Sequence, residues 1–347
     1  MSQPMIGHRG DEAKELLEDI TPKLKPVFGT EEEVLVLAGS GTAGLETAVV
    51  NTVKPGDEVL VIVTGAFGDR FAKICDAYEI RYHRLDVPWG EAVHPEKVAH
   101  LLQQHPGISA VFCTYCETST GVLNPVADIA KAVRQYSNAL VIVDGVSAVG
   151  GAETKMDEWG VDVVVTGSQK ALMLPAGNNR SRFYFDLRQY RDNLEKNSTP
   201  FTPAVSLLFG LQEVLKLLEE EGLEEVYRRH QLMMKMTRAA FQALDIPLFT
   251  ADSDASPTVT AVKPADFNPE MLRKAVKEDF GLTLAGGQQH LKGQIFRIGH
   301  MGYCSPADVL QTISLLEIGL TKIGKSIELG KGVQAAQEIY VNQEGQK

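Results

Sequence analysis

Short apolar runs alternate with segments of helical periodicity along the first half of this chain. The runs are Val34–Ala38, Glu58–Val63, Ala110–Thr114, Leu140–Asp144 and Asp162–Thr166. Brief runs of this kind between helical segments are typical of parallel strands that are buried on both faces. The pattern therefore predicts an α/β fold with a mostly parallel, doubly wound sheet. Before one of the helices, Asn124 is placed to cap the first turn and Pro125 to occupy it.

The second half of the chain has a different pattern. From Ala204 to about Leu244 the apolar residues recur at helical spacing, with a break near Gly222, which predicts a connecting pair of helices. A mixture of strand and helix patterns follows over 247–262, 268–278, 295–298 and 307–319. We therefore expect a large domain over residues 1–240 and a smaller α+β domain over residues 241–347. The polar tail after Gly330 is expected to fray.

The composition and charge of the chain indicate which kinds of molecule it binds. The chain has 347 residues, of which 44% are hydrophobic and 23% charged, and its net charge is −11. A strongly acidic chain disfavours nucleic acid and anionic membranes as partners, because both attract clustered Lys and Arg. No apolar run approaches the length of a membrane span, and residues 1–30 show no secretory signal pattern. We expect a soluble, cytoplasmic protein that binds a small molecule.

The four cysteines predict no metal site. Cys113 and Cys116 have the spacing C-x-x-C, but Cys75 and Cys304 complete no ligand set with them. A redox pair is the alternative that this spacing leaves open. We expect instead that Cys113 ends a buried strand and that Cys116 begins a loop.

The segment Gly39–Gly44 satisfies the spacing G-x-G-x-x-G between an apolar run and a helical pattern. Small residues at a helix N-terminus let backbone N–H groups approach phosphate oxygens, and Ser40 and Thr42 add hydroxyl donors. A nicotinamide-binding unit would require an acidic residue at the end of the next strand. That strand ends instead in the neutral segment 64–68, where Phe67 suits stacking on a flat cofactor. The segment predicts a bound phosphate, but not which cofactor carries it.

Asp144 and Lys170 follow two apolar runs at their carboxyl ends. In an open α/β sheet such positions face the crevice where ligands bind. An ordinary Asp–Lys ion pair is the simpler interpretation. Together with a phosphate-binding turn, however, the pair suggests pyridoxal phosphate, which needs a lysine amine for a Schiff base and a carboxylate beside the pyridine nitrogen. Burial would lower the pKa of Lys170 and help it to move the Cα proton.

These motifs resemble those of the class V aminotransferases, which include alanine–glyoxylate, serine–glyoxylate and serine–pyruvate aminotransferases. Agreement extends in order from residues 4–9 to residues 297–302 and is closest around Lys170. The resemblance implies a fold type I enzyme that depends on pyridoxal phosphate. It also implies a homodimer with the active site at the interface between the subunits.

By this resemblance, Ser40, Gly41, Thr42 and Gln169 would hold the cofactor phosphate. In relatives, a segment resembling Thr199-Pro200-Phe201-Thr202-Pro203 reaches the phosphate in the neighbouring subunit. Thr202 matches the contacting position there. Thr199 stands where relatives often have Tyr, so we expect no phosphate contact from it.

The same resemblance assigns the residues around the ring. Phe67 would stack on one face of the pyridine ring and Val146 would pack on the other. Thr118 would contact the hydroxyl side, Asp144 would pair with the ring nitrogen, and Lys170 would form the Schiff base.

Arg297 is the expected clamp for the substrate carboxylate, because a guanidinium can bind a carboxylate through two parallel hydrogen bonds. A surface role is the alternative for this residue. The segment Gly286-Gly287-Gln288 could form a flexible loop over the site. Two features depart from the family: a Pro-Gly-Pro segment usually precedes the stretch resembling residues 5–9, and Asn179 stands where small residues are usual.

The sequence therefore predicts a transaminase with a ping-pong mechanism. The expected donor is alanine or serine, and the expected acceptor is glyoxylate or pyruvate. A lyase of the cysteine desulfurase type is an alternative, but it typically has His where Gln169 stands and needs a mobile nucleophilic cysteine. A non-catalytic homologue that lacks the N-terminal substrate segment is a further alternative, which the presence of Asp144, Lys170 and Arg297 opposes.

Overall fold

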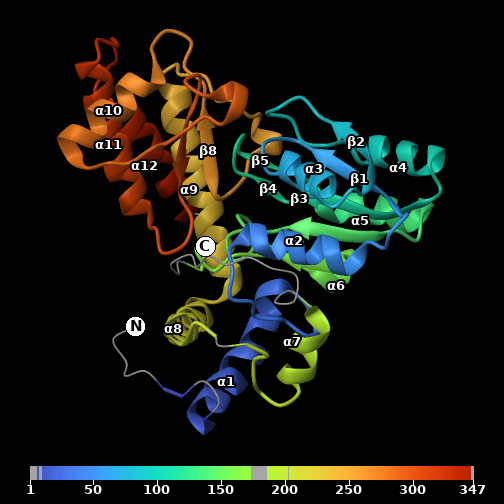
Figure 1. Cartoon of the computed structure of the whole chain (residues 1–347). Coiled ribbons are helices and arrows are strands. Elements are labelled where there is room, and N and C mark those ends of the chain that lie inside the picture. Colours follow the sequence, from blue (N-terminus) through green and yellow to red (C-terminus); the bar gives the residue numbers. More distant parts are fainter. Residues whose placement is uncertain (1–5, 8–9, 173–185, 202, 345–347) are drawn as a thin grey trace.

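A five-stranded parallel sheet forms the centre of the computed structural model, which describes residues 6–7, 10–172, 186–201 and 203–344. The strand order is β2-β1-β3-β6-β7, and every neighbouring pair in it is parallel (Figure 1). The strands are β1 (Glu58–Val63), β2 (Arg81–Asp86), β3 (Ile108–Thr114), β6 (Leu140–Asp144) and β7 (Val163–Val165). The predicted α/β fold with a parallel, doubly wound sheet is confirmed.

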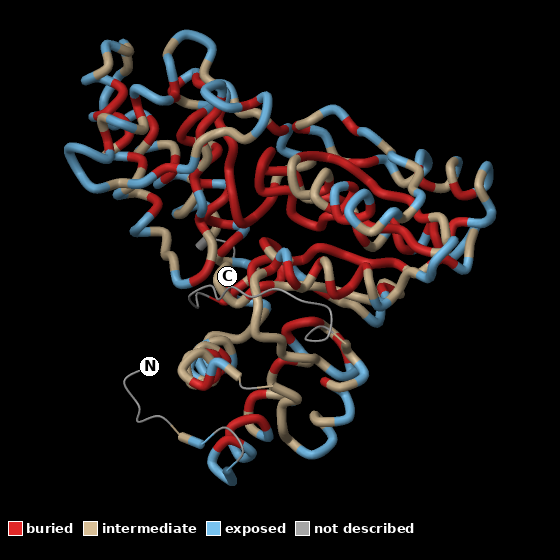
Figure 2. The backbone as a smooth tube through the Cα atoms, in the orientation of Figure 1, coloured by how far each residue is buried: buried red, intermediate tan, exposed pale blue. Residues whose placement is uncertain are grey.

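Successive residues of each strand enter hydrophobic clusters on opposite faces of this sheet, as the alternation of side chains requires. In β1, Leu60 and Ile62 pack on one face, and Val59 and Val61 pack on the other. Helices α4 and α5 cover the first face, and α2 and α3 cover the second. Buried residues follow the strands between these layers (Figure 2). The helices are α2 (Gly41–Thr52), α3 (Gly68–Ala77), α4 (Pro95–Gln104), α5 (Val126–Tyr136) and the short α6 (Met156–Trp159).

A separate group of helices lies below the sheet in Figure 1 and contains α1 (Asp11–Phe28), α7 (Leu187–Leu194) and α8 (Val205–Glu221). Helices α1 and α8 pack on each other around a third hydrophobic cluster. The prediction of a strand at Val34–Ala38 is wrong, because this run pairs with no strand of the described residues. Val34 and Val36 are half-buried and pack on the α1–α8 cluster instead, so helices rather than neighbouring strands cover the run.

The predicted pair of connecting helices is confirmed. Helix α8 ends at Glu221, and α9 (Leu223–Ala243) begins after Gly222, whose φ of 81° favours glycine. Beyond α9 lies a three-stranded antiparallel sheet with the order β8-β10-β9. The proposed domain boundary at residue 240 falls inside α9, and the division into two domains stays a prediction. The remaining elements are β4 (Cys116–Glu117), β5 (Val122–Leu123), β8 (Val259–Val262), α10 (Pro269–Phe280), β9 (Ala285–Gly286), β10 (Phe296–Gly299), α11 (Pro306–Lys322) and two 3₁₀ turns (Asp252–Asp254 and Gln289–Leu291).

The polar C-terminal tail forms a helix, α12 (Lys331–Glu344), so the prediction that it frays is wrong. Its apolar residues face α9: Ala336 is fully buried there, and Val333, Ile339 and Tyr340 pack on the same cluster. The start of α12 is held by the buried carboxylate of Glu317. This carboxylate accepts N–H bonds from Gly330 (2.6 Å) and Gly332 (2.7 Å), which lie at the end where a helix favours negative charge.

Asn124 does not cap α5 as predicted, because its side chain points into the space between neighbouring loops. The N-cap is Pro125, and no side chain caps the helix. The Asn124 amide donates to the Thr64 hydroxyl (2.9 Å) and to the Thr114 carbonyl (2.8 Å), and its oxygen accepts the Val93 N–H (3.1 Å). These bonds determine where the Asn124 side chain points, because a buried polar group without a hydrogen bond would destabilise the folded protein.

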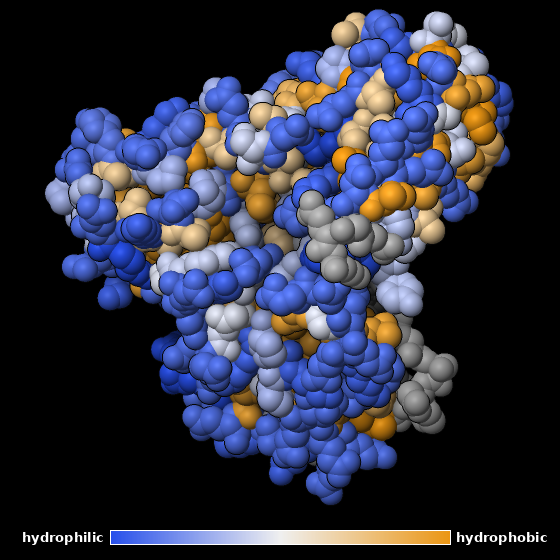
Figure 3. Space-filling model, turned by 180° about the vertical axis from the view of Figure 1, so that it is seen from behind, coloured by the Kyte–Doolittle hydropathy of each residue, from blue (hydrophilic) through white to orange (hydrophobic). Residues whose placement is uncertain are grey.

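The surface seen from behind is largely hydrophilic, with hydrophobic residues scattered among polar ones (Figure 3). Within the described ranges, no helix is both long and apolar enough to cross a membrane.

His300 is a buried neutral base between β10 and the segment before β8. Its side chain is 2% exposed, and its ring nitrogens lie 2.9 Å from the Pro257 carbonyl and 2.9 Å from the Thr260 hydroxyl. Burial lowers the pKa of His300 from 6.5 to about 4, and the nearby His230 adds to the effect. Between these two pH values the unfolded chain binds more protons at this residue than the folded chain, so stability falls as the pH is lowered through this window.

We predict that His300→Gln reduces the loss of stability on acidification. The full effect of His300 corresponds to about 3 kcal/mol between about pH 6.5 and about pH 4. Urea unfolding of both proteins at about pH 7 and about pH 4.5 measures it, because the difference between the two pH dependences isolates this histidine from other groups. Equal pH dependence in the two proteins would contradict the prediction.

Candidate active site

A cavity of about 210 Å³ lies at the carboxyl ends of the parallel strands. It brings together every residue predicted to bind the cofactor except Thr202, which lies outside the described residues. The lining residues are Ser40, Gly41, Thr42, Leu45, Phe67, Arg70, Cys116, Thr118, Asp144, Val146, Ser147, Gln169 and Lys170.

The N-terminus of α2 forms one wall of this cavity. Ser40 caps the helix, and its hydroxyl accepts the Ala43 N–H at 3.3 Å. A Cβ atom at Gly41 would lie 2.9 Å from a methyl group of Val146, so only glycine lets the helix approach this side chain so closely. The N–H groups of a first helical turn have no partner within the helix. This wall is therefore suited to an anion.

Arg70 lines the cavity and was not predicted from the sequence. It lies in the first turn of α3, and its guanidinium carbon is 4.7 Å from the centre of the Phe67 ring. Its Nη1 donates to the Thr42 hydroxyl at 2.9 Å. Arg70 thus connects the ring of Phe67 to the start of α2 and adds positive charge beside the anion-binding wall. Its spacing of three residues from Phe67, which suits contact along a helix, was the available signal.

Asp144 ends β6, and its side chain is 3% exposed. One carboxylate oxygen accepts the Val146 N–H at 3.0 Å. Burial raises the pKa of Asp144 to about 7, and the negative charge of Glu117 contributes, while Arg70 and Lys170 oppose the shift. A cationic N–H group placed in the cavity would therefore stabilise the ionised form of this carboxylate.

Lys170 follows β7 in a turn and is half-buried in the cavity wall. Burial lowers the pKa of its amine, and the charge of Arg297 acts in the same direction. Both effects favour the neutral amine, which is the nucleophilic form. Among the described residues no direct ion pair joins Asp144 to Lys170, although the charge of each acts on the pKa of the other across the cavity.

Comparison with known proteins identifies the family. The family model for Aminotransferase class-V matches residues 2–178. The chain belongs to the class V aminotransferases. As a member of this family it is a pyridoxal-phosphate-dependent transaminase, which confirms the predicted enzyme class and cofactor.

The chain is similar to proteins with different names. The soluble hydrogenase small subunit of Synechococcus sp. (strain PCC 6716) is 42% identical over 96% of this chain and 92% of its own length. The L-aspartate–glyoxylate aminotransferase of Paracoccus denitrificans is 33% identical over 98% of this chain and 91% of its own. The solved structure of ureidoglycine–glyoxylate aminotransferase from Bacillus subtilis superposes with a TM-score of 0.92 at 32% identity, over 98% of this chain and 93% of that chain.

The donor set of the cavity fits the family's cofactor. The start of α2, the hydroxyls of Ser40 and Thr42, and the Arg70 guanidinium could hold a phosphate. Phe67 offers a flat apolar face for the ring, and the buried Asp144 offers a carboxylate for the ring nitrogen. The close packing of Gly41 on Val146 holds the start of α2 beside the loop that follows Asp144.

Arg297 lies in β10 and does not line the 210 Å³ cavity itself. Its Nη1 donates to the Thr118 carbonyl (2.6 Å), and its Nε donates to the Gly286 carbonyl (3.0 Å). Burial lowers the pKa of Arg297, and the negative charge of Glu117 acts against this. The guanidinium thus joins the antiparallel sheet to the Thr118 loop, and its role as a carboxylate clamp stays a prediction.

The segment after β9 contacts α3. Gly286 belongs to β9, and the 3₁₀ turn that follows carries Gln289, whose amide donates to Asp69 at 3.2 Å. The rings of His290 and Trp89 lie 4.2 Å apart. The 3₁₀ turn directly after the predicted loop 286–288 therefore contacts the helix that carries Arg70, and the flexibility of the loop stays a prediction.

The cysteines form no disulfide within the described ranges. Cys113 lies at the end of β3 as predicted, whereas Cys116 belongs to the short strand β4 rather than to a loop. The Cys116 sulfur lies 2.9 Å from the Ser256 hydroxyl, and burial raises the pKa of this thiol to about 11. Among the residues that the structure describes, no group of three or more His, Cys, Asp or Glu side chains could hold a metal ion.

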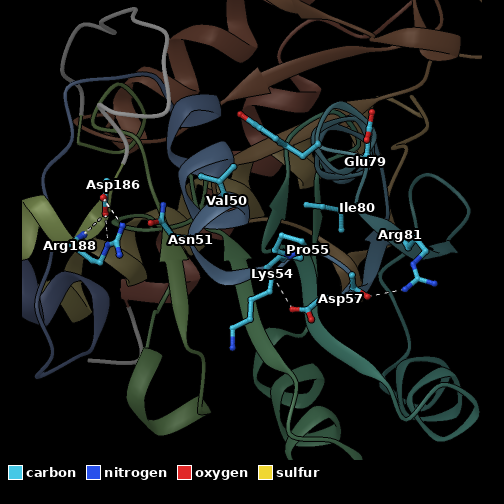
Figure 4. Close-up of a pocket in the computed structure, with 13 residues that line it drawn as sticks. Val50, Asn51, Lys54, Pro55, Asp57, Glu79, Ile80, Arg81, Asp186 and Arg188 are labelled. Atoms are coloured by element: carbon cyan, nitrogen blue, oxygen red, sulfur yellow. Dashed lines mark hydrogen bonds and ion pairs between the residues drawn. The ribbon is translucent and has the colours of Figure 1, made fainter.

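A larger cavity of about 830 Å³ lies at the opposite, amino ends of β1 and β2 (Figure 4). Its two arginines already have partners within the chain. Arg188 pairs with Asp186 at 2.9 Å, and the Arg81 guanidinium donates to the Gly56 carbonyl at 2.9 Å. Lys170 and Asp144 are absent from its wall. The smaller cavity is therefore the candidate active site.

We predict that Arg70→Gln weakens the binding of pyridoxal phosphate by about tenfold or more, because the phosphate loses a neighbouring cation and Phe67 loses its contact. Titration of the apoenzyme, followed by absorbance, measures the Kd. The control is Arg81→Gln at the opposite end of the sheet, which should leave the Kd unchanged. An unchanged Kd for Arg70→Gln would refute the role.

Proposed function

We propose that this transaminase moves the amino group of a small amino acid, alanine or serine, to glyoxylate, with pyruvate as the second candidate acceptor. The observation that carries this proposal is the convergence of Lys170, the buried Asp144 and the anion-binding start of α2 on one cavity. Two similar proteins whose named donors differ, aspartate and ureidoglycine, share glyoxylate in their names. This agreement supports glyoxylate as the acceptor more strongly than it supports any one donor.

The proposed roles follow from the chemistry of each side chain. Bound pyridoxal phosphate supplies an electron sink for the carbanion at the substrate α-carbon. The Asp144 carboxylate would stabilise the protonated, positively charged form of the ring nitrogen. Lys170 carries the cofactor, and its amine takes the α-proton and returns it. Arg297 orients the substrate carboxylate. In the ping-pong order, the donor leaves as an oxo acid before the acceptor binds.

Further residues would complete the cofactor site. We assign Ser40, Gly41, Thr42 and Gln169 to the phosphate, since all four line the cavity. Phe67 and Val146 would enclose the ring, with Thr118 on its hydroxyl side; all three line the same cavity. Contact of Thr202 with the phosphate of a second subunit belongs to the proposed homodimer. We also propose a cytoplasmic setting.

A lyase of the cysteine desulfurase type is less well supported. Such an enzyme needs a thiolate nucleophile, but burial raises the pKa of the Cys116 thiol, the one that lines the cavity. Gln169, not His, precedes Lys170. A non-catalytic homologue is opposed by the intact set of Asp144, Lys170 and Arg297.

We predict that the purified protein is yellow and that borohydride reduction fixes the cofactor on Lys170. Lys170→Ala should lose this fixation and reduce transamination by about a thousandfold or more, because the base is removed. Transamination is measured with a panel of alanine, serine, aspartate, glutamate and aminoethylphosphonate, each combined with a panel of oxo acids. Fixed cofactor in Lys170→Ala would refute the assignment of Lys170, and activity with no glyoxylate or pyruvate pair would refute the proposed acceptors.

We predict that Arg297→Lys raises the KM for both the amino acid and the oxo acid by about tenfold or more, because an ammonium cannot form the paired hydrogen bonds. Arg273→Lys is the matched control. Arg273 lies in α10, donates to the Leu284 carbonyl at 3.0 Å and does not line the cavity. Steady-state kinetics with both substrates varied will separate KM from kcat. Similar KM values in the two variants would count against the clamp.

A further inference from the structure

Glu117 is a fully buried carboxylate that lies behind the candidate active site. Its side chain is 0% exposed, and it belongs to β4 between Cys116 and Thr118, two residues that line the cavity. Glu117 itself does not line the cavity. No role proposed above uses this charge, and a buried charge without compensation would be strongly destabilising.

The compensation comes from two loops that meet at this carboxylate. One oxygen accepts the N–H groups of Phe67 (3.1 Å) and Gly68 (3.0 Å), at the start of α3. The other oxygen accepts the Ser119 N–H (3.1 Å) and the Ser119 hydroxyl (2.5 Å). In all four bonds the partner of Glu117 is the donor. An ionised carboxylate suits this arrangement because its oxygens only accept hydrogen bonds. The N-terminus of α3, where Phe67 and Gly68 lie, also favours a negative charge because of the helix dipole.

The fit of these loops leaves no spare space. A Cβ atom at Gly65 would lie 2.4 Å from the carboxyl carbon of Glu117 and 2.5 Å from the Ser119 hydroxyl. The Ser119 hydroxyl in turn accepts the Ala66 N–H at 3.0 Å. Residues 65–68 and 117–119 are therefore joined in one network that depends on Glu117 and Ser119.

Both loops carry a residue assigned to the cofactor ring. Phe67, whose N–H binds Glu117, is the proposed stacking residue. Thr118 lies between Glu117 and Ser119 and is the proposed contact on the hydroxyl side of the ring. The Thr118 carbonyl also accepts the 2.6 Å bond from Arg297. A shift of the Glu117 network would consequently reach the ring and the proposed substrate clamp together.

We propose that Glu117 is a positioning residue that fixes Phe67 and Thr118 on two sides of the cofactor ring without touching the cofactor. The inference rests on the proposed function, because it takes the ring contacts from it. Burial raises the pKa of Glu117, whereas the bonds from Ser119, Gly68 and Phe67 act against this and favour the ionised carboxylate through which Glu117 acts. An amide in its place would direct N–H groups at backbone N–H donors, so the two loops would separate.

The chain contains a matched control for this proposal. Glu317 is also a buried carboxylate that accepts backbone N–H bonds at the start of a helix, from Gly330, Gly332 and Val333 at the start of α12. Neither Glu317 nor α12 lines the cavity. Glu317→Gln therefore removes the same kind of interaction from a position outside the active site.

The experiment compares Glu117→Gln with Glu317→Gln and the unchanged chain. Three quantities are measured: the thermal midpoint of the apoenzyme, the Kd for pyridoxal phosphate, and the circular dichroism of the bound cofactor, which reports the asymmetry around the ring. We expect both variants to lower the midpoint. Only Glu117→Gln should raise the Kd, by about tenfold or more, and weaken the cofactor dichroism.

Ser119→Ala tests the network if Glu117→Gln does not fold. It keeps the charge but removes the hydroxyl that binds both Glu117 and Ala66, so we expect the Kd to rise by about threefold or more. A cofactor dichroism and Kd equal to those of the unchanged chain, in whichever variant folds, would overturn the proposal. So would equal losses of affinity in Glu117→Gln and Glu317→Gln, since these would indicate general destabilisation. If the unchanged chain bound no cofactor, the proposed function itself would fail.

Discussion

The removal of Asp144 from water is the constraint on which the arrangement of the site depends. Strand β6 is buried on both faces, so the carboxylate at its end can meet a partner only at the edge of the sheet where the cavity opens. Burial raises the pKa of Asp144 to about 7. Near neutral pH, its charge therefore depends on which group lies beside it in the cavity. A cofactor with a basic ring nitrogen changes this balance, because the proton and the opposite charge can then be shared in one contact.

Two buried acids, Glu117 and Asp144, lie in this region, and their different surroundings give each a different task. The charge of Glu117 raises the pKa of Asp144, whereas Arg70 lowers it. Glu117 is satisfied by four donors from two loops, so its charge is fixed in place. Asp144 accepts a backbone N–H and faces the cavity. The first acid can therefore serve the framework while the second remains available to a ligand.

Much of the fold could be predicted because it depends on local patterns. Strands β1 and β6 were predicted with their observed bounds, since both are apolar runs buried on both faces. The edge strand β2 was missed because Arg81, Arg84 and Asp86 are exposed, so this strand, which has only one neighbouring strand, does not form an apolar run. The run at 34–38 had the pattern of a strand, but its burial comes from helices. Burial alone does not specify which element supplies it.

The cofactor site shows the same division. Ser40, Asp144 and Lys170 could be placed from the sequence, because each follows or begins an element whose end defines its position. Arg70 and Glu117 could not be placed in this way. The partners of Glu117 at Phe67 and Gly68 are separated from it by 50 and 49 residues, and nothing in the local sequence around Glu117 indicates them.

The loops at the carboxyl ends of the parallel strands are also held by residues 250–258 and by strand β10 of the antiparallel sheet. The Thr258 hydroxyl donates to the Ser147 carbonyl (2.8 Å), the Thr250 hydroxyl donates to the Thr120 carbonyl (2.6 Å), and the Arg297 guanidinium donates to the Thr118 carbonyl. Each bond satisfies a carbonyl in a loop beside the cavity. The antiparallel sheet and the segment before it thus fix the backbone around the cavity, and their movement would reach Thr118 and Ser147.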